Sequence, residues 1–166
     1  MTGDETDYIE GPIPMKLFDR VILRNIVAAA LLMLAAGGQA LAADEPEAGQ
    51  HAQPAVDEGN YRYQLFVPRG VSITDPERKW PLMLFLHGSG ERGDDVDAVK
   101  RHGPPKLAEH DPDFPFILIS PLLPAEEDWD IAKLDRILDH ALATLPIDPD
   151  RVYLTGLSRG GHATWR

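Results

Sequence analysis

The feature that most limits how this 166-residue chain can fold is a glycine-flanked serine that directly follows an apolar strand signal. The strand signal is Val152 to Thr155, and Gly-Leu-Ser-Arg-Gly occupies positions 156–160. This order predicts a sharp turn from a strand into a helix, with Ser158 at its tip in strained backbone geometry. Gly156 and Gly160 leave the room that larger side chains would take from the adjoining strand and helix. A glycine-rich surface turn is the alternative interpretation of this motif taken alone.

A second motif lies upstream of the serine. Pro81 to Leu86 is an unbroken apolar run, which is typical of a strand buried on both faces of a parallel sheet. It leads into the polar, glycine-rich segment His-Gly-Ser-Gly-Glu-Arg-Gly at 87–93. Open α/β sheets bind their ligands at the carboxyl ends of their strands, so this segment is a candidate binding loop.

Four stretches together resemble the α/β-hydrolase superfamily. They are Leu84 to Asp94, His102 to Pro105, Phe114 to Pro121 and Asp148 to Gly161. The chain is most similar there to bacterial predicted peptidases and esterases, which are related to prolyl-oligopeptidase catalytic domains, dienelactone hydrolases and phospholipase/carboxylesterases. The resemblance covers about Tyr61 to Arg166. It is specific for the fold and unspecific for the substrate.

The resemblance implies roles for individual residues. Ser158 corresponds to the catalytic nucleophile, and the backbone N–H groups of Ser89 and Arg159 correspond to the oxyanion hole, with Gly88 as the less favoured donor. The residues expected to support the two motifs are His87, Gly88, Gly90, Gly156 and Gly160. No cofactor and no metal is expected.

The catalytic acid and base are not found at the positions that the resemblance implies. In this superfamily both follow the serine, in the order Ser, Asp, His. The only histidine after Ser158 is His162, which is four residues further along the expected helix and is therefore interpreted as structural. We expect the chain to be the N-terminal part of a hydrolase fold, truncated just after the nucleophile turn and inactive alone, because a serine without a base is a poor nucleophile.

Three side-chain groups near the motifs have more than one interpretation. Glu91 and Arg92 either contact substrate or form a structural ion pair, and the structural pair is favoured. The Arg159 side chain either binds an acidic substrate group or pairs with Glu91. The acidic run 126–128 is interpreted as a solvated cap of the following helix.

The N-terminal region has the pattern of an export signal. Residues 1–14 are interpreted as an over-called start. The segment from Met15 to Ala42 has basic residues, an apolar run and an Ala-Leu-Ala cleavage site after which the mature chain begins. A retained membrane anchor is the alternative. Residues 43–59 are expected to be a flexible acidic linker, and 60–166 the N-terminal part of the catalytic domain.

The composition limits the classes of molecule that the chain is expected to bind. The net charge of −11 argues against nucleic acid and anionic membranes, and the absence of cysteine excludes disulfides. The leading hypothesis is a periplasmic or secreted serine hydrolase of small-molecule or polysaccharide esters, without stable membrane association after signal cleavage. The alternatives are a serine peptidase acting on peptides and a non-catalytic remnant or binding module.

Alternating strand and helix signals predict an α/β fold with a mostly parallel sheet flanked by helices. The expected strands are 61–67, 81–86, 114–120 and 152–155. A loop and then a short helix are expected within 98–109, where Gly103-Pro104-Pro105 interrupts the pattern. Apolar residues from Leu134 to Leu145 recur at helical spacing, which predicts an amphipathic helix that Asp128 or Asp130 caps.

Overall fold

Five strands of the described residues form one mixed sheet. A computed structural model describes residues 45–75 and 77–165. The strands are β1 (Gly49–Gln53), β2 (Tyr63–Val67), β3 (Trp80–Leu86), β4 (Ile117–Pro121) and β5 (Ile147–Gly156). Their spatial order is β1-β2-β4-β3-β5.

The half of the sheet that leads to the two motifs is parallel. β3 lies in the middle of this half and pairs in parallel with both β4 and β5, and Leu86 at the end of β3 is opposite Gly156 at the end of β5. β2 runs antiparallel to β4, and β1 runs antiparallel to β2. The parallel half therefore brings the ends of β3 and β5 side by side, at one edge of the sheet.

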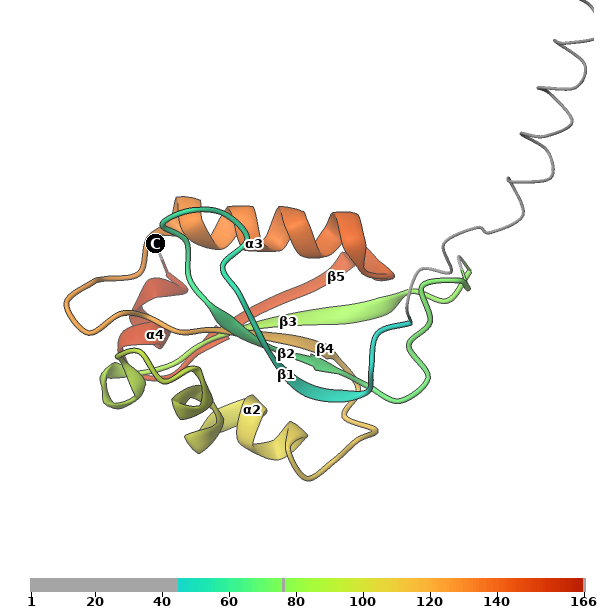
Figure 1. Cartoon of the computed structure of the whole chain (residues 1–166), viewed down its shortest axis with the longest axis horizontal. Coiled ribbons are helices and arrows are strands. Elements are labelled where there is room, and N and C mark those ends of the chain that lie inside the picture. The colour runs from blue at the N-terminus through green and yellow to red at the C-terminus, as the bar shows by residue number, and fades with distance from the viewer. Residues whose placement is uncertain (1–44, 76, 166) are drawn as a thin grey trace, which may run out of the picture. The chain divides into compact units, whose positions relative to one another are not determined.

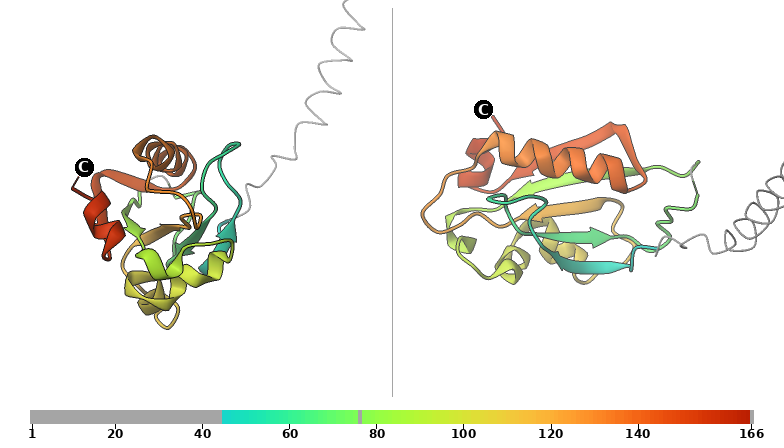
Figure 2. Two further views of the ribbon diagram at one scale, coloured as in Figure 1. Left: turned by 90° about the vertical axis from the view of Figure 1, so that its left-hand side faces the viewer. Right: turned by 45° about the horizontal axis from the view of Figure 1, so that its top comes forward.

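Helices cover both faces of the sheet, as Figures 1 and 2 show. α3 (Ile131–Thr144) lies on one face, and α2 (Gly103–Ala108) lies on the other. Two short 3-10 helices, η1 (Ser89–Glu91) and η2 (Val96–Arg101), lead from β3 to α2, and α4 (Arg159–Ala163) follows β5. These layers confirm the predicted α/β class with helices on both faces of the sheet, but the sheet is mixed and not mostly parallel.

The core follows from the alternation of side chains along β3. Leu82, Leu84 and Leu86 face α3 and belong to the larger buried cluster. Phe85 faces the other way and packs in a second cluster with Ala108 of α2. Because both faces of β3 are covered by helices, its sequence is apolar throughout, as the unbroken run in the sequence predicts.

α3 matches its prediction closely. The Asp130 side chain accepts a hydrogen bond from the Ala132 N–H at 2.9 Å and so caps the helix, while Asp128 does not. Leu134, Ile137 and Ala141 are buried on the face toward the sheet.

Two segments expected to be irregular contain regular structure. Within the expected linker 43–59, β1 adds an antiparallel edge to the sheet, so this part of the linker prediction is wrong. The polar side chains of β1 conceal it, because one face of an edge strand meets water. The short helix expected within 98–109 is found as α2, which begins at Gly103-Pro104-Pro105 because proline fits the first turn, where backbone N–H groups have no helical partner. The residues before it, expected to be a loop, form the 3-10 helix η2 instead.

The segment Asp148-Pro149-Asp150 has the residues of a turn and precedes the predicted strand 152–155, but it lies inside β5. Trp80 pairs with Ile147, but Leu82 already pairs with Val152, so β5 holds extra residues opposite β3. The Asp150 N–H donates to the Asp148 side chain at 3.0 Å, which is a local turn within the strand. The turn signal therefore marks an irregularity of the strand and not its boundary.

The export signal predicted between Met15 and Ala42, and the over-called start before it, lie outside the described residues. Within 45–75 and 77–165, no helix has the length and apolar character needed to cross a membrane.

The outer edge of β5 pairs with no other described strand. Leu154 and Tyr153 on this strand are 47% and 48% exposed, and Trp165 beyond α4 is 92% exposed. An apolar strand with free N–H and C=O groups is a template for pairing with another chain.

We therefore expect the 166-residue chain to associate as its concentration rises. Leu154→Lys should raise the protein concentration at which the chain associates at least about threefold, because a charge on an edge strand opposes pairing. The matched control is Leu107→Lys, which charges an exposed leucine of α2 (62% exposed) away from this edge. Sedimentation velocity measures both, and equal effects of the two variants would contradict the prediction.

Candidate functional site

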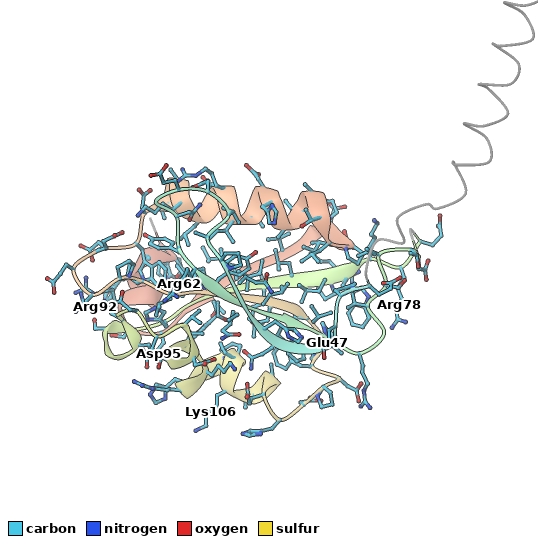
Figure 3. The ribbon with its side chains drawn as sticks, in the orientation of Figure 1. Glu47, Arg62, Arg78, Arg92, Asp95 and Lys106 are labelled. Atoms are coloured by element: carbon cyan, nitrogen blue, oxygen red, sulfur yellow. The ribbon has the colours of Figure 1, made fainter. Side chains whose placement is uncertain are left out.

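Three segments meet at the carboxyl end of the parallel strands. They are the His87 loop (residues 87–93) after β3, the β4 loop (residues 122–130) after β4, and the serine turn (residues 156–160) after β5. Figure 1 shows α4 at this end of the sheet, and Figure 3 labels Arg92 of the His87 loop there, opposite the end that carries Arg78.

The serine turn has the strained backbone that its sequence predicts. Ser158 has φ 51° and ψ −112°, and it is the only non-glycine of the described residues with positive φ. Such a conformation persists only where the surroundings impose it. The Leu157 N–H donates to the Leu86 carbonyl at 2.9 Å, which anchors the turn to the end of β3.

The glycines of the serine turn permit this close approach. A Cβ on Gly160 would lie 1.8 Å from the Leu86 carbonyl oxygen, and one on Gly156 would lie 2.4 Å from the Gly160 carbonyl carbon. Neither position can hold a side chain without movement of the backbone. The steric reason given for both glycines in the sequence analysis is therefore confirmed.

Two glycines of the His87 loop, Gly88 and Gly90, differ in how closely other atoms surround them. A Cβ on Gly88 would lie 3.5 Å from the Ser158 Cβ and 3.4 Å from the Leu157 carbonyl oxygen, so this residue faces the serine turn. A Cβ on Gly90 would meet no heavy atom within 4 Å. Nothing in the structure requires glycine at position 90.

His87 ties its loop to the β4 loop. Its buried ring accepts the Leu123 N–H at Nε2 (2.9 Å), so Nδ1 carries the proton and donates to the Gly88 carbonyl at 2.7 Å. The ring also packs edge-on against Trp129. Burial lowers the pKa of His87 below its ordinary value of 6.5, although the hydrogen bond to Gly88 opposes this effect. The ring is thus held neutral, with both nitrogens occupied by backbone groups.

Glu91 and Arg92 have partners other than those expected. Glu91 is buried, and its carboxylate lies 3.7 Å from His87 Nδ1 and 3.4 Å from His102 Nε2. Arg92 donates to the Ala125 carbonyl at 2.6 Å. The described residues hold no Glu91–Arg92 ion pair, so the favoured pairing is wrong, while both side chains do serve structure.

The Arg159 side chain has intramolecular partners that were not expected. Its Nε donates to Ser89 Oγ at 3.0 Å, and its guanidinium pairs with the Asp128 carboxylate. The pairing with Glu91 is not formed. Asp128, interpreted from the sequence as a solvated helix cap, is instead part of the site, and its acidic neighbours in the run 126–128 concealed it.

A cavity of about 550 Å³ lies beside the serine turn. Its lining residues are Ser89, Asp128, Trp129, Ser158, Arg159, His162 and Ala163. The structure thus brings the predicted nucleophile and both predicted oxyanion residues to one cavity. His162 lines the cavity too, but none of the described histidine rings forms a hydrogen bond with Ser158.

No protein-family model matches the chain, and no curated protein does. Among solved structures, a thermostable esterase is 29% identical with a TM-score of 0.53, over 70% of this chain and 36% of its own. A Thermogutta terrifontis esterase, Est2, with butyrate bound is 18% identical (TM-score 0.47), over 70% of this chain and 42% of its own.

Esterase B from Lactobacillus rhamnosis, in a structure with a tributyrin phosphonate, is 22% identical with a TM-score of 0.48, over 87% of this chain and 48% of its own. The chain thus spans less than half the length of each of these three structures. Of these three structures, only the thermostable esterase is similar enough to support a conclusion about this chain. It confirms the resemblance to α/β-hydrolase esterases for the part that the chain spans.

The packing predicts that replacing a glycine of the serine turn lowers the melting temperature more than replacing Gly90 of the His87 loop. Gly160→Ala should lower the melting temperature by roughly 10 °C or prevent folding, because its Cβ collides with the Leu86 backbone. The control is Gly90→Ala, which should stay within about 2 °C of the original chain. Thermal unfolding followed by circular dichroism measures both, and a small effect of Gly160→Ala would show that the turn is not as tight as described.

The neutral, buried His87 predicts a loss of stability in acid. As the pH falls below 6.5, the unfolded chain takes up a proton at this residue that the folded chain does not, so the free energy of unfolding decreases. In His87→Gln this contribution, at most about 1.4 kcal/mol per pH unit, should disappear. Melts between pH 7.5 and 5 measure the slope. His140→Gln, an exposed histidine of α3, should keep the original slope, and an unchanged slope in His87→Gln would contradict the assignment.

Proposed function

We propose that this chain carries the nucleophile and the oxyanion hole of a serine esterase that acts on small-molecule esters. The observation that carries the proposal is the strained Ser158, held at the tip of a glycine-packed turn beside a cavity that Ser89 also lines. Strain of this kind is stored at functional sites, where it exposes a reactive group. The thermostable esterase, 29% identical, supports ester hydrolysis as the chemistry.

The proposed reaction proceeds through an acyl-enzyme. The Ser158 oxygen attacks the ester carbonyl carbon, and its proton passes to a base that the described residues do not supply. The backbone N–H groups of Ser89 and Arg159 stabilise the negative charge on the carbonyl oxygen. The tetrahedral intermediate collapses, the alcohol leaves with a proton, and water then attacks the acyl-enzyme to release the acid and restore the Ser158 hydroxyl.

The same chemistry would cleave a peptide, and the sequence alone leaves the two bonds open. We prefer the ester because the similar structure with 29% identity is a thermostable esterase. A polysaccharide ester remains within the proposal as a larger substrate of the same class. Export through the segment Met15 to Ala42 is part of the proposal as well, on the pattern of its sequence.

A fluorophosphonate probe tests the nucleophile. We expect the protein expressed from its whole natural reading frame to be labelled covalently, and Ser158→Ala to abolish labelling and to lower turnover of a short-chain ester by about 10⁴ to 10⁶. Ser72→Ala is the control, because this serine bonds Glu45 and Thr74 outside the cavity. Labelling that persists in Ser158→Ala would exclude the proposed nucleophile.

A further inference from the structure

The two residues proposed to supply the oxyanion hole are joined to each other by their side chains. Arg159 Nε donates to Ser89 Oγ at 3.0 Å, although 70 positions separate the two residues in the chain. The same guanidinium pairs with Asp128, so one side chain connects the serine turn, the His87 loop and the β4 loop. All three residues line the cavity beside Ser158.

Ser89 begins the short 3-10 helix η1, in the exposed middle of the His87 loop. The start of the loop is fixed by the His87 ring, and its end is fixed by the Gly93 N–H, which donates to the Leu123 carbonyl at 3.1 Å. Between these points Ser89 and Gly90 are both exposed, and Gly90 has open space around it. Besides the bond from Arg159 to its hydroxyl, Ser89 accepts a side-chain hydrogen bond from Arg92 Nε at its carbonyl (3.4 Å).

The position of Ser89 relative to Arg159 matters for the proposed chemistry. An oxyanion hole works only when both N–H groups lie about 2.7–3.1 Å from the same developing oxyanion. The Arg159 N–H is placed by the serine turn, whereas the Ser89 N–H is placed by a different loop. The hydrogen bond between the two side chains directly connects these two segments.

Asp128 orients the guanidinium. An arginine side chain has many rotamers, and its planar fork is held best by two partners in different directions. With Asp128 as the second partner, the Arg159 charge has a counter-charge within the chain. The pair is exposed, so it contributes little to stability, and its contribution lies in geometry.

We infer that the side chains of Arg159, Ser89 and Asp128 are positioning groups that hold the two oxyanion donors at their working distance. This inference rests on the proposed function, because it assigns these side chains a role in the same site. It also excludes direct recognition of an anionic substrate by Arg159.

Steady-state kinetics on a neutral ester, p-nitrophenyl acetate, test the inference in the protein from its whole natural reading frame. Ser89→Ala and Arg159→Ala keep both backbone N–H groups but remove the link. Each should lower kcat at least about tenfold with KM within about threefold, less than the roughly 10²–10³ for loss of a whole donor. The double variant should be no worse than either single one, because both remove one interaction.

Three further variants separate positioning from other roles. Asp128→Asn should give a smaller loss of kcat, and Arg159→Lys should fail to restore activity, because lysine lacks the planar fork. Ser89→Thr retains the hydroxyl and should retain most activity. The matched control is Arg136→Ala, which removes an exposed arginine paired with Asp57 at 2.8 Å on α3, and it should leave kcat unchanged.

Two kinetic results would overturn the inference. Losses that multiply in the double variant would show that the two side chains act independently. An increase in KM confined to an ester that carries a carboxylate, such as mono-p-nitrophenyl succinate, would show that Arg159 recognises substrate.

Hydrogen exchange of backbone amides distinguishes this inference from the proposed function. If Ser158 reacts with no probe and the protein hydrolyses no ester, the proposed function fails, but the link can still be measured. Arg159→Ala should then speed exchange at the Glu91 and Arg92 amides, whose N–H groups close the turns of the 3-10 helix η1, at least about tenfold and leave the Leu123 amide unchanged, whereas Arg136→Ala should change neither. Unchanged exchange at Glu91 and Arg92 in Arg159→Ala would overturn the link itself.

Discussion

The site depends on the contact between the backbone of α4 and the carboxyl end of β3. Only glycine at position 160 permits it, since a Cβ there would lie 1.8 Å from the Leu86 carbonyl oxygen. This contact places the serine turn directly against the start of the His87 loop, and the hydrogen bond from Leu157 to Leu86 fixes it there. The strain at Ser158 is the local consequence, because the chain must reverse direction within a few residues.

Around this contact, the loops are held mainly by backbone hydrogen bonds and buried side chains. His87 binds the β4 loop through one ring nitrogen and its own loop through the other, and Trp129 packs on the ring. Arg92 adds a bond to the Ala125 carbonyl. The exposed pair of Arg159 and Asp128 lies above this buried layer, on the cavity. Stability and fine positioning are therefore assigned to different residues of the same site.

The sequence predicts the parts of this structure whose residue pattern has one physical cause. Three features each follow from a single local requirement and are found as expected: the apolar run of β3, the buried face of α3 and the glycines of the serine turn. β1 was not predicted, because an edge strand with polar residues resembles a linker. The partners of Glu91 and Arg159 were not predicted either. These partners depend on which loops the fold brings together, and a local sequence pattern does not contain that information.

The long sequence separations within the site bear on how the chain acquires it. His87 finds its partner Leu123 36 positions later, and Ser89 finds Arg159 70 positions later. Closing such long loops reduces the chain entropy before the contacts that stabilise them can form, and such non-local pairings slow folding. During synthesis β3 and its polar loop emerge well before β5 can join them. The Ser158 turn can therefore acquire its strained form only after β5 has joined β3, and until then the nascent chain has no shaped site.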